Sequence, residues 1–281
     1  MSIVRASAIH TGRVQLTKHH GLGNDFLVTF VDDVPPDASS RAQLLCDRRT
    51  GIGADGLIYG IDEGSTVVMR LFNSDGSTAE ISGNGMRCFL QATAMRRGVK
   101  SLEIDVDTLA GIRQCSFTAG EDPTIGSASV DMGPVTAGDE PDRMDFLDIN
   151  DVSANRWAIG AVGNPHVVID MDNPQDIDLA TVGPRIEQHF PHGVNMHAVT
   201  VAGPDTLTLV VWERGAGITQ ACGSGATVAA QRFHEWGAVG ETVTVNMPGG
   251  SAVVDVAVPE RDSAILSGPT TYVGSIEVPG G

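Results

Sequence analysis

The amino-acid sequence predicts an α/β (α+β) protein of two pseudo-symmetric domains, each a curled, mostly antiparallel sheet around one central helix. Three observations lead to this prediction. Short stretches of alternating apolar and polar residues dominate the 281-residue chain, a pattern typical of strands. Each half has one strongly apolar helical stretch that follows a glycine-rich segment. Four short segments also recur at one constant offset of 140 residues, which indicates two copies of one unit.

The recurring segments carry glycines and polar side chains suited to holding a charged small molecule. The pairs are Gly23-Asn24 with Gly163-Asn164, Gly53-Ala54-Asp55 with Gly193-Val194-Asn195, Asn73 with Glu213, and Ser82-Gly83-Asn84-Gly85 with Cys222-Gly223-Ser224-Gly225. A single insertion would shift the later pairs, so one offset shared by all four is hard to obtain by chance. A site between two such copies presents similar groups to opposite faces of a ligand. That geometry suits a reaction on both faces of one carbon atom.

Strands are expected wherever the period-2 pattern is bounded by Gly, Pro or Asp. In chain order these stretches are 14–20, 26–33, 65–72, 101–108, 127–133, 166–172, 197–203, 207–213, 242–248 and 252–258. A last strand, Thr270–Val278, is expected to cross back and complete the first sheet. The turn sequence at 131–134 divides the chain into an N-terminal domain (1–131 plus 269–281) and a C-terminal domain (132–268).

Two helices are expected directly after the glycine-rich pairs. They are Gly85–Arg97, ended by Gly98, and Gly225–Trp236, ended by Gly237, because Gly just past the last helical residue is a common stop. Both stretches are apolar or small on most faces, so each is expected to be buried all round. Two weaker helical stretches contain Arg41–Cys46 and Arg185–His189.

The charge balance excludes some partners and indicates a habitat. The chain has 24 Asp and 11 Glu against 16 Arg and 2 Lys, a formal net charge of −17. Such an acidic surface argues against nucleic acid as a partner, because phosphates need cationic contacts. An acid excess with few lysines is typical of proteins from salt-loving organisms, where salt screens the self-repulsion. An ordinary acidic cytosolic protein is the alternative.

Other compositional features narrow the class of protein. No run of about 18 apolar residues predicts a membrane span, and the first residues lack the apolar stretch of a secretory signal. The four cysteines (Cys46, Cys88, Cys115 and Cys222) show no disulfide or CxxC pattern, which favours reduced thiols in a cytoplasm. None of the eight histidines lies in an HExxH pattern, so we expect no metal. Only Lys18 and Lys100 could form a pyridoxal-phosphate Schiff base, and neither lies in a recognisable cofactor setting.

The candidate site centres on Cys222 and the two glycine-rich segments. Glycines at a helix start let a carboxylate approach backbone N–H groups at the positive end of the helix dipole. Each segment alone fits a tight helix-entry turn equally well. A cysteine at a helix N-terminus is expected to have a pKa below the free value of about 8.5. Side chains that could bind an amino acid are Asn24, Asn73, Asn164, Asn195, Glu213 and Arg214, although a single loop Asn is more often a turn residue.

Six ordered segments resemble the diaminopimelate epimerase family, over essentially the whole chain from about Val14. They are GLGNDF (21–26), CDRRTGIGADGLI (46–58), FNSDGSTAEISGNGMRC (72–88), GNPHVVI (163–169), VNMHAV (194–199) and WERGAGITQACGSGA (212–226). The resemblance implies two α/β domains with the active site in the cleft between them, and no cofactor. It implies that one cysteine removes the α-proton and a second returns one, interconverting LL- and meso-2,6-diaminopimelate on the route to lysine.

Roles carry over by position from this resemblance. Cys222 matches the second catalytic cysteine, and His166 and Glu213 match residues that tune the catalytic thiols. The carboxylate cradle at the reacting centre matches Gly83, Asn84, Gly223 and Ser224, with Asn24 beside it. The residues that match those gripping the substrate, mainly at its distal end, are Asn73, Asn164, Asn195, Glu213 and Arg214. Residues 1–12 precede the family's usual start, and no function is assigned to them.

Ser82 departs from the family, which has its first catalytic cysteine at this position. A hydroxyl is a far weaker acid than a thiol, so Ser82 is expected to be a poor base that could relay a proton through water. Cys88 matches a different family cysteine and does not replace it. Ser82 is either an engineered change or a natural one, and serine also occurs here in related proline and hydroxyproline epimerases. The alternatives are another racemase or a dehydratase of the superfamily, or a protein that binds without turnover. We expect a cytoplasmic protein that binds diaminopimelate and can form a homodimer.

Overall fold

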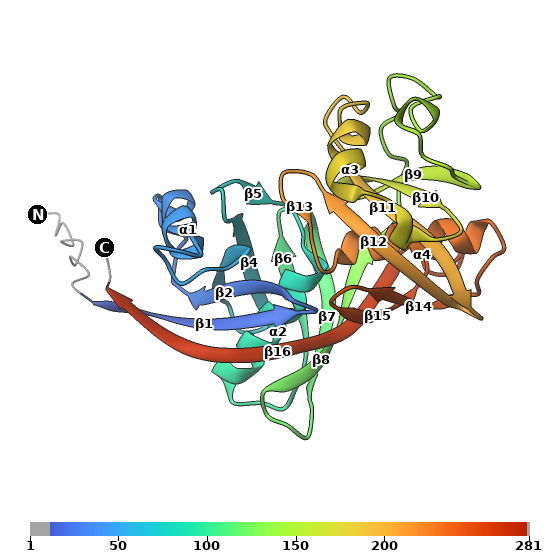
Figure 1. Ribbon diagram of the computed structural model, residues 1–281. Coiled ribbons are helices and arrows are strands. Elements are labelled where there is room, and N and C mark those ends of the chain that lie inside the picture. The colour runs from blue at the N-terminus through green and yellow to red at the C-terminus, as the bar shows by residue number, and fades with distance from the viewer. Residues whose placement is uncertain (1–11, 280–281) are drawn as a thin grey trace, which may run out of the picture.

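The computed structural model describes residues 12–279, and two similar halves lie side by side in it (Figure 1). The strands of the first half are β1 (Arg13–Gly21), β2 (Asn24–Phe30), β3 (Gly56–Asp62), β4 (Thr66–Asn73), β5 (Thr78–Ala79), β6 (Ser101–Thr108), β7 (Gly111–Ala119) and β8 (Ile125–Gly133). Its helices are α1 (Ala38–Cys46) and α2 (Gly83–Arg97). α2 is buried over most of its length inside the curled sheet, as its apolar sequence predicts.

The second half repeats this order of elements. Its strands are β9 (Arg156–Val162), β10 (Asn164–Asp170), β11 (Asn195–Gly203), β12 (Thr206–Glu213), β13 (Gly217–Ile218), β14 (Thr242–Met247), β15 (Gly250–Asp255) and β16 (Ala264–Pro279). Its helices are α3 (Leu179–Glu187) and α4 (Gly223–Glu235), with short 3-10 turns at Asp148–Asn150 and Pro174–Asp176. α4 is the central, buried helix of this half.

The duplication seen in the sequence is also present in the backbone. β10 repeats the bounds of β2 at an offset of 140 residues, and β12 repeats those of β4. β2 and β3 pair in parallel, then β3 and β4 antiparallel, and β10, β11 and β12 repeat this pattern. Gly23 and Gly163 have φ of +85° and +73°, a left-handed conformation that favours glycine at both copies of one turn. The structure therefore contains two copies of one unit.

The strand and helix predictions were correct for most elements and wrong at identifiable places. The expected helices begin two residues earlier than predicted, at Gly83 and Gly223. Gly98 ends α2 in the left-handed conformation, as predicted. Alternation did not predict β3, β7, β9 or the two-residue strands β5 and β13, and the last strand begins at Ala264 rather than Thr270.

The long strand β16 connects the two halves. Its first part pairs with β15 and β8, and its second part, from Thr271 to Pro279, pairs with β1. Figure 1 shows it as a long curved strand that runs from one half into the other. On the edge of β16 that faces β15 and β1, pairing with β15 ends at Ser267 and pairing with β1 begins at Thr271. Pro269 lies in this gap, so its missing backbone N–H interrupts neither ladder.

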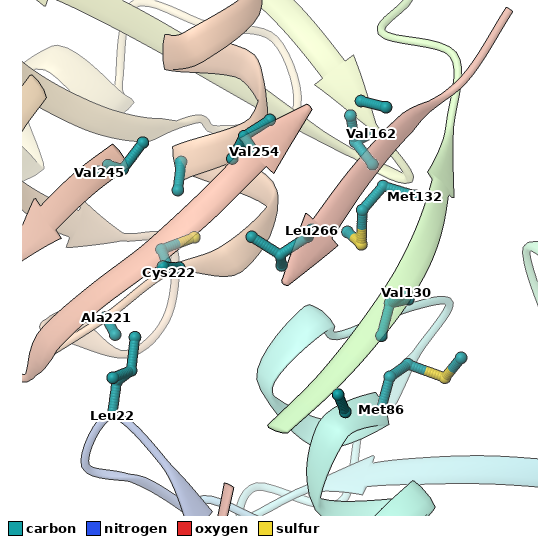
Figure 2. Close-up of a cluster of buried hydrophobic side chains, with 14 of the residues drawn as sticks. Leu22, Met86, Val130, Met132, Val162, Ala221, Cys222, Val245, Val254 and Leu266 are labelled. Carbon is teal, nitrogen blue, oxygen red and sulfur yellow. The ribbon is translucent and has the colours of Figure 1, made fainter. Parts of the chain in front are cut away.

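One hydrophobic cluster runs through both halves and includes Cys222. In Figure 2, Leu266 of β16 lies between Cys222 of the second half and Met132 of the first. None of the helices within residues 12–279 is both long and apolar enough to cross a membrane. Because the core is continuous across β16, the helix starts on either side of it are held in fixed relation.

Candidate active site

The N-termini of α2 and α4 touch each other. A Cβ atom placed on Gly83 would lie 3.5 Å from Cα of Gly223, and one on Gly223 would lie 3.3 Å from Cα of Gly83. The same two Cβ atoms would lie 2.5 and 2.8 Å from Cδ2 of Leu266, too close for a real contact. A side chain at either position would displace Leu266 and press on the other helix, so glycine at both favours the close meeting of the two helix starts, which brings their positive dipole ends together.

Ser82 and Cys222 occupy equivalent positions directly before these helices. Both are N-cap residues in extended conformation, with φ/ψ of −141°/116° for Ser82 and −128°/108° for Cys222. The Ser82 hydroxyl oxygen accepts from the Gly85 N–H at 3.1 Å, which is the ordinary capping bond of a serine. Sγ of Cys222 lies 3.6 Å from Oγ of Ser224. The pair predicted from the 140-residue offset is thus equivalent in local geometry.

The prediction that the helix terminus lowers the pKa of Cys222 was wrong for this conformation. Cys222 is only 4% exposed, and burial raises the pKa of its thiol well above its usual value. Repulsion from the Glu213 carboxylate adds to the rise, while the Gly225 N–H and the Ser224 hydroxyl oppose it. A helix terminus contributes at most about 2 kcal/mol, and desolvating an anion costs more. The thiol is therefore protonated when the site is empty.

In the first half, amide side chains form a directional hydrogen-bond chain. Nη2 of Arg87 donates to Oδ1 of Asn84 at 2.7 Å, and Nδ2 of Asn84 donates to Oδ1 of Asn24 at 3.1 Å. Nδ2 of Asn24 then donates to Oδ2 of Asp55 at 2.6 Å. Nδ2 of Asn84 also donates to the Ala221 carbonyl at 3.1 Å. The side chain of Asn84 is thus committed within the protein, and only its backbone N–H remains for a ligand.

Arg87 brings a buried positive charge to this chain. Its side chain is 0% exposed, and Nη1 has no hydrogen-bond partner within residues 12–279. Burial lowers the pKa of its guanidinium to about 10, so it stays charged near neutrality. A cation one turn from a helix N-terminus adds to the positive end of the dipole. The head of α2 is accordingly suited to an anion.

In the second half, two histidines take the place of this amide chain. Nε2 of His166 lies 2.9 Å from Oδ1 of Asn164, and Nδ1 of His166 lies 2.9 Å from Nε2 of His197. Both rings are completely buried, and burial lowers the pKa of His197 to about 3 and that of His166 well below its usual value. Both imidazoles are therefore neutral. His197 was not among the residues that sequence reasoning selected.

A ring nitrogen of each histidine and Sγ of Cys222 lie within 4.8 Å of one another. Two imidazoles and a thiol are ligands that a zinc ion accepts. Three of the four ring nitrogens are, however, already engaged in the hydrogen bonds to Asn164 and between the rings. These bonds account for three of the four ring nitrogens, and we assign no metal to the cluster.

The remaining predicted residues lie along β12 and the strands beside it. The buried Asn195 donates to the Pro165 carbonyl at 2.9 Å and accepts from the Arg214 backbone N–H at 3.0 Å. The exposed guanidinium of Arg214 donates to the His192 carbonyl at 2.5 Å. Glu213 accepts from the Thr219 hydroxyl, and burial raises the pKa of its carboxyl. The Glu213 carboxylate and the Cys222 thiol are close enough for each to affect the pKa of the other.

Two predicted features stand apart from this assembly. Nδ2 of Asn73 donates to Oγ of Ser77 within its own turn, at 3.0 Å, and no contact in the described residues ties Asn73 to Cys222. The cleft implied by the resemblance is neither of two hollows found in residues 12–279. Two hollows of about 540 and 560 Å³ lie at the sheet, one beside β6 and β7 and one between β7 and β15. Neither hollow is lined by Cys222 or Ser82.

The sequence is similar to known proteins over most of its length. A family model described as diaminopimelate epimerase matches residues 16–137 and 159–273. A diaminopimelate epimerase of Thioalkalivibrio sulfidiphilus is 37% identical, over 95% of this chain and 100% of that protein. One of Methanothermobacter thermautotrophicus is 36% identical, over 86% of this chain and 90% of that protein.

Solved structures with low sequence identity share the fold. A predicted epimerase of Pseudomonas aeruginosa superposes with a TM-score of 0.75 at 15% identity, covering 94% of this chain and 99% of that one. A hydroxyproline epimerase of Agrobacterium vitis, with bound trans-4-hydroxy-L-proline, gives 0.65 at 15% identity, covering 95% and 92%. The match to the family model and the relatives aligned over most of their length show that the chain belongs to the diaminopimelate epimerase family, a family of isomerases.

Proposed function

We propose that the chain interconverts LL- and meso-2,6-diaminopimelate by α-proton transfer, in the biosynthesis of lysine. The single observation that carries this proposal is the equivalence of Ser82 and Cys222 at the touching N-termini of α2 and α4. Epimerisation needs one proton carrier on each face of the α-carbon, and a duplicated fold supplies one position from each half. The family and its named relatives support diaminopimelate as the substrate.

The substrate carboxylate at the reacting centre binds between the two helix starts. Backbone N–H groups of Gly83-Asn84 and Gly223-Ser224 receive it, aided by the charge of Arg87. When the Cα–H bond breaks, its electron pair delocalises into this carboxylate, where the paired dipoles stabilise the added negative charge. A proton delivered to the opposite face then inverts the centre. No cofactor takes part in these steps.

Cys222 carries the proton on one face. Its thiol has to ionise before it can act as the base, and in the empty site burial and Glu213 oppose this. A substrate ammonium group held by Glu213 would neutralise that repulsion and lower the pKa of the thiol. On the other face Ser82, directly or through a water molecule, returns the proton. Asn164, Asn195 and Arg214 hold the distal end of the substrate. Asn24 and Asn73 face it from the first half.

Binding without full turnover is the second candidate, favoured by the capping bond of Ser82. The Ser82 hydroxyl caps a helix and ionises only far above neutral pH, so it is a weak base. The other members of the superfamily, racemases or dehydratases, are less favoured because they do not require the distal-end residues.

The deciding experiment measures deuterium incorporation at the α-carbon in D₂O, from each diaminopimelate isomer separately. We expect exchange by the native chain and its loss in Cys222→Ala with an unchanged circular dichroism spectrum. Cys115→Ala, which removes a buried thiol elsewhere, is the matched control and should retain exchange. Binding of diaminopimelate without exchange in the native chain would favour the second candidate. Residual exchange in Cys222→Ala at most of the native rate would exclude Cys222 as the acid–base group.

Cytoplasmic location, a homodimer and adaptation to high salt remain predictions for this chain. The net charge of −17 supports the last of them.

A further inference from the structure

His166 and His197 form a buried imidazole pair beside Cys222. They lie on the adjacent parallel strands β10 and β11, where His197 pairs in register with Val168. The ring centroids are 5.1 Å apart and the ring planes are inclined at 41°. At 2.9 Å between Nδ1 of His166 and Nε2 of His197, one of the two nitrogens carries the shared proton.

The hydrogen bonds fix which nitrogen that is. Oδ1 of Asn164 can only accept, so Nε2 of His166 carries a hydrogen and donates to it. His166 is neutral, so its Nδ1 has a lone pair and accepts from Nε2–H of His197. His197 then has a bare Nδ1, which is the ring nitrogen without a partner among residues 12–279. The reverse assignment would bury an N–H group with no acceptor, the costlier arrangement.

The backbone of α4 holds the ring of His197 in place. A Cβ on Gly225 would lie 1.9 Å from Cε1 and 2.3 Å from Nε2 of His197, so the imidazole occupies the space of that missing side chain. Gly225 also contributes the N–H that favours the Cys222 thiolate. The ring therefore packs directly against the helix turn that carries the thiol, and glycine at 225 makes this possible.

The first half shows that the fold itself does not require this pair. The positions 140 residues earlier are Phe26 and Leu57, both buried hydrocarbons on β2 and β3. In that half Asn24 is oriented by Asp55 and Asn84 instead. Each half thus orients its recurring asparagine, Asn24 or Asn164, by different chemistry. The imidazole pair is present only in the half that carries Cys222.

We propose that His197 is a positioning residue: its Nε2–H holds His166 in the Nε2–H tautomer, which turns the Nδ2 amide of Asn164 toward the substrate. The role in substrate binding rests on the proposed function, whereas the tautomer of His166 does not. Nδ2 of Asn164 is then a donor for a substrate carboxylate. Without the donor from His197, either ring nitrogen of His166 can carry the hydrogen, and Asn164 loses its fixed orientation.

The first measurement uses the native protein without substrate. Long-range ¹H–¹⁵N NMR correlations distinguish the two tautomers of a neutral imidazole. We expect His166 and His197 both to be in the Nε2–H form. An Nδ1–H form of His166 in the native chain would overturn the proposal, whatever the enzyme's activity.

Two variants test the consequence for binding. His197→Leu inserts the residue found at the equivalent position 57 and removes the donor, so a mixture of His166 tautomers and a rise of about tenfold in KM are expected, with kcat changed less. His197→Gln places an amide N–H near the former Nε2 and should recover most of the lost affinity and the single tautomer. Equal behaviour of the two variants would contradict a positioning role.

Val199→Ala is the matched control for packing. Val199 is buried on β11 two residues from His197, on the same face of the strand. Its truncation should lower thermal stability while leaving the His166 tautomer and KM in place. If His197→Leu does not fold, the native-state tautomers and His197→Gln still decide the question. Loss of catalysis with the expected tautomers would count against the proposed function and not against this assignment.

Discussion

Nδ2 of Asn84 donates to the carbonyl of Ala221 at 3.1 Å, so a residue in the first turn of α2 holds the residue directly before Cys222. This hydrogen bond crosses between the two halves at the point where their helices touch. The same amide donates to Asn24, and its oxygen accepts from Arg87. The backbone position of the thiol in one half is thus set by an amide in the other.

Asn84→Ala is expected to impair catalysis as well as stability. The substitution leaves Oδ1 of Asn24, the Ala221 carbonyl and a guanidinium N–H of Arg87 without their partner. Each such loss costs about 1–3 kcal/mol, although the three are not additive. Urea unfolding and steady-state kinetics measure the two effects. Asn150→Ala, which removes a buried amide bound to the Phe146 carbonyl far from the site, should lower stability alone. Equal kinetics in the two variants would show that Asn84 is structural only.

Ser82→Cys is expected to raise epimerisation strongly. With Cys222 as the one thiol, one face of the α-carbon has a competent proton carrier and the other has a hydroxyl that rarely ionises. The native chain should therefore exchange the α-proton of one isomer faster than it interconverts the two. Even a tenfold gain corresponds to about 1.4 kcal/mol of barrier. Stereochemically resolved deuterium incorporation from LL- and meso-diaminopimelate compares the variants. Fast interconversion by the Ser82 protein would show that serine, or a water it holds, suffices.

Arg214→Ala should weaken diaminopimelate binding by about 2 kcal/mol, the value for a hydrogen bond to a charged group. The side chain is exposed, and its Nη1–H group donates to the His192 carbonyl. A guanidinium has five N–H donors, so others remain for a substrate carboxylate. Titration calorimetry gives the dissociation constant. Arg185→Ala on α3 removes an exposed arginine with no assigned role and serves as the control. An unchanged constant in Arg214→Ala would place this side chain outside the site.

Mild acid should destabilise the fold through its buried histidines. Burial lowers the pKa of His19 to about 4 and that of His197 to about 3 from an ordinary 6.5. Below pH 6.5 the unfolded chain binds protons on both residues that the folded chain does not, so stability falls as pH falls toward 4. Each histidine contributes about 1.4 kcal/mol per pH unit within this window. Urea midpoints at pH 7, 6 and 5 measure the slope, which His19→Gln should reduce. A flat profile would contradict neutral buried rings.

Stability should rise with salt concentration. A net charge of −17 repels itself in dilute buffer, and at about 1 M salt the Debye length falls to about 3 Å and screens this repulsion. Thermal melting in increasing KCl is expected to shift upward by many degrees. Sucrose at equal osmolality separates screening from exclusion of a co-solute. The same melting temperature in dilute buffer and in high salt would contradict halophilic adaptation.

The sequence predicted what depends on local pattern and on the duplication. The equivalent places of Ser82 and Cys222 near the two helix starts, and the buried central helices, follow from glycine placement and apolar periodicity, although both helices begin two residues earlier than predicted. β3 was missed because it is buried on both faces for most of its length and so does not alternate. The pKa of Cys222 was wrong because it depends on burial by strands distant in sequence, which no local pattern reveals. His197 could have been found: it is a polar residue aligned at the 140-residue offset with the apolar Leu57.

The pairing of β1 with the end of β16 has a consequence for synthesis on the ribosome. Arg13 pairs with Pro279, so the first half lacks its closing strand until residue 279 has emerged. Until then the free edge of β1 offers unpaired backbone groups to other chains, a recognised route to aggregation. The second half, whose strands follow one another closely in sequence, can form before the first is complete. A nascent chain released before residue 279 has been made therefore exposes an open sheet edge along β1.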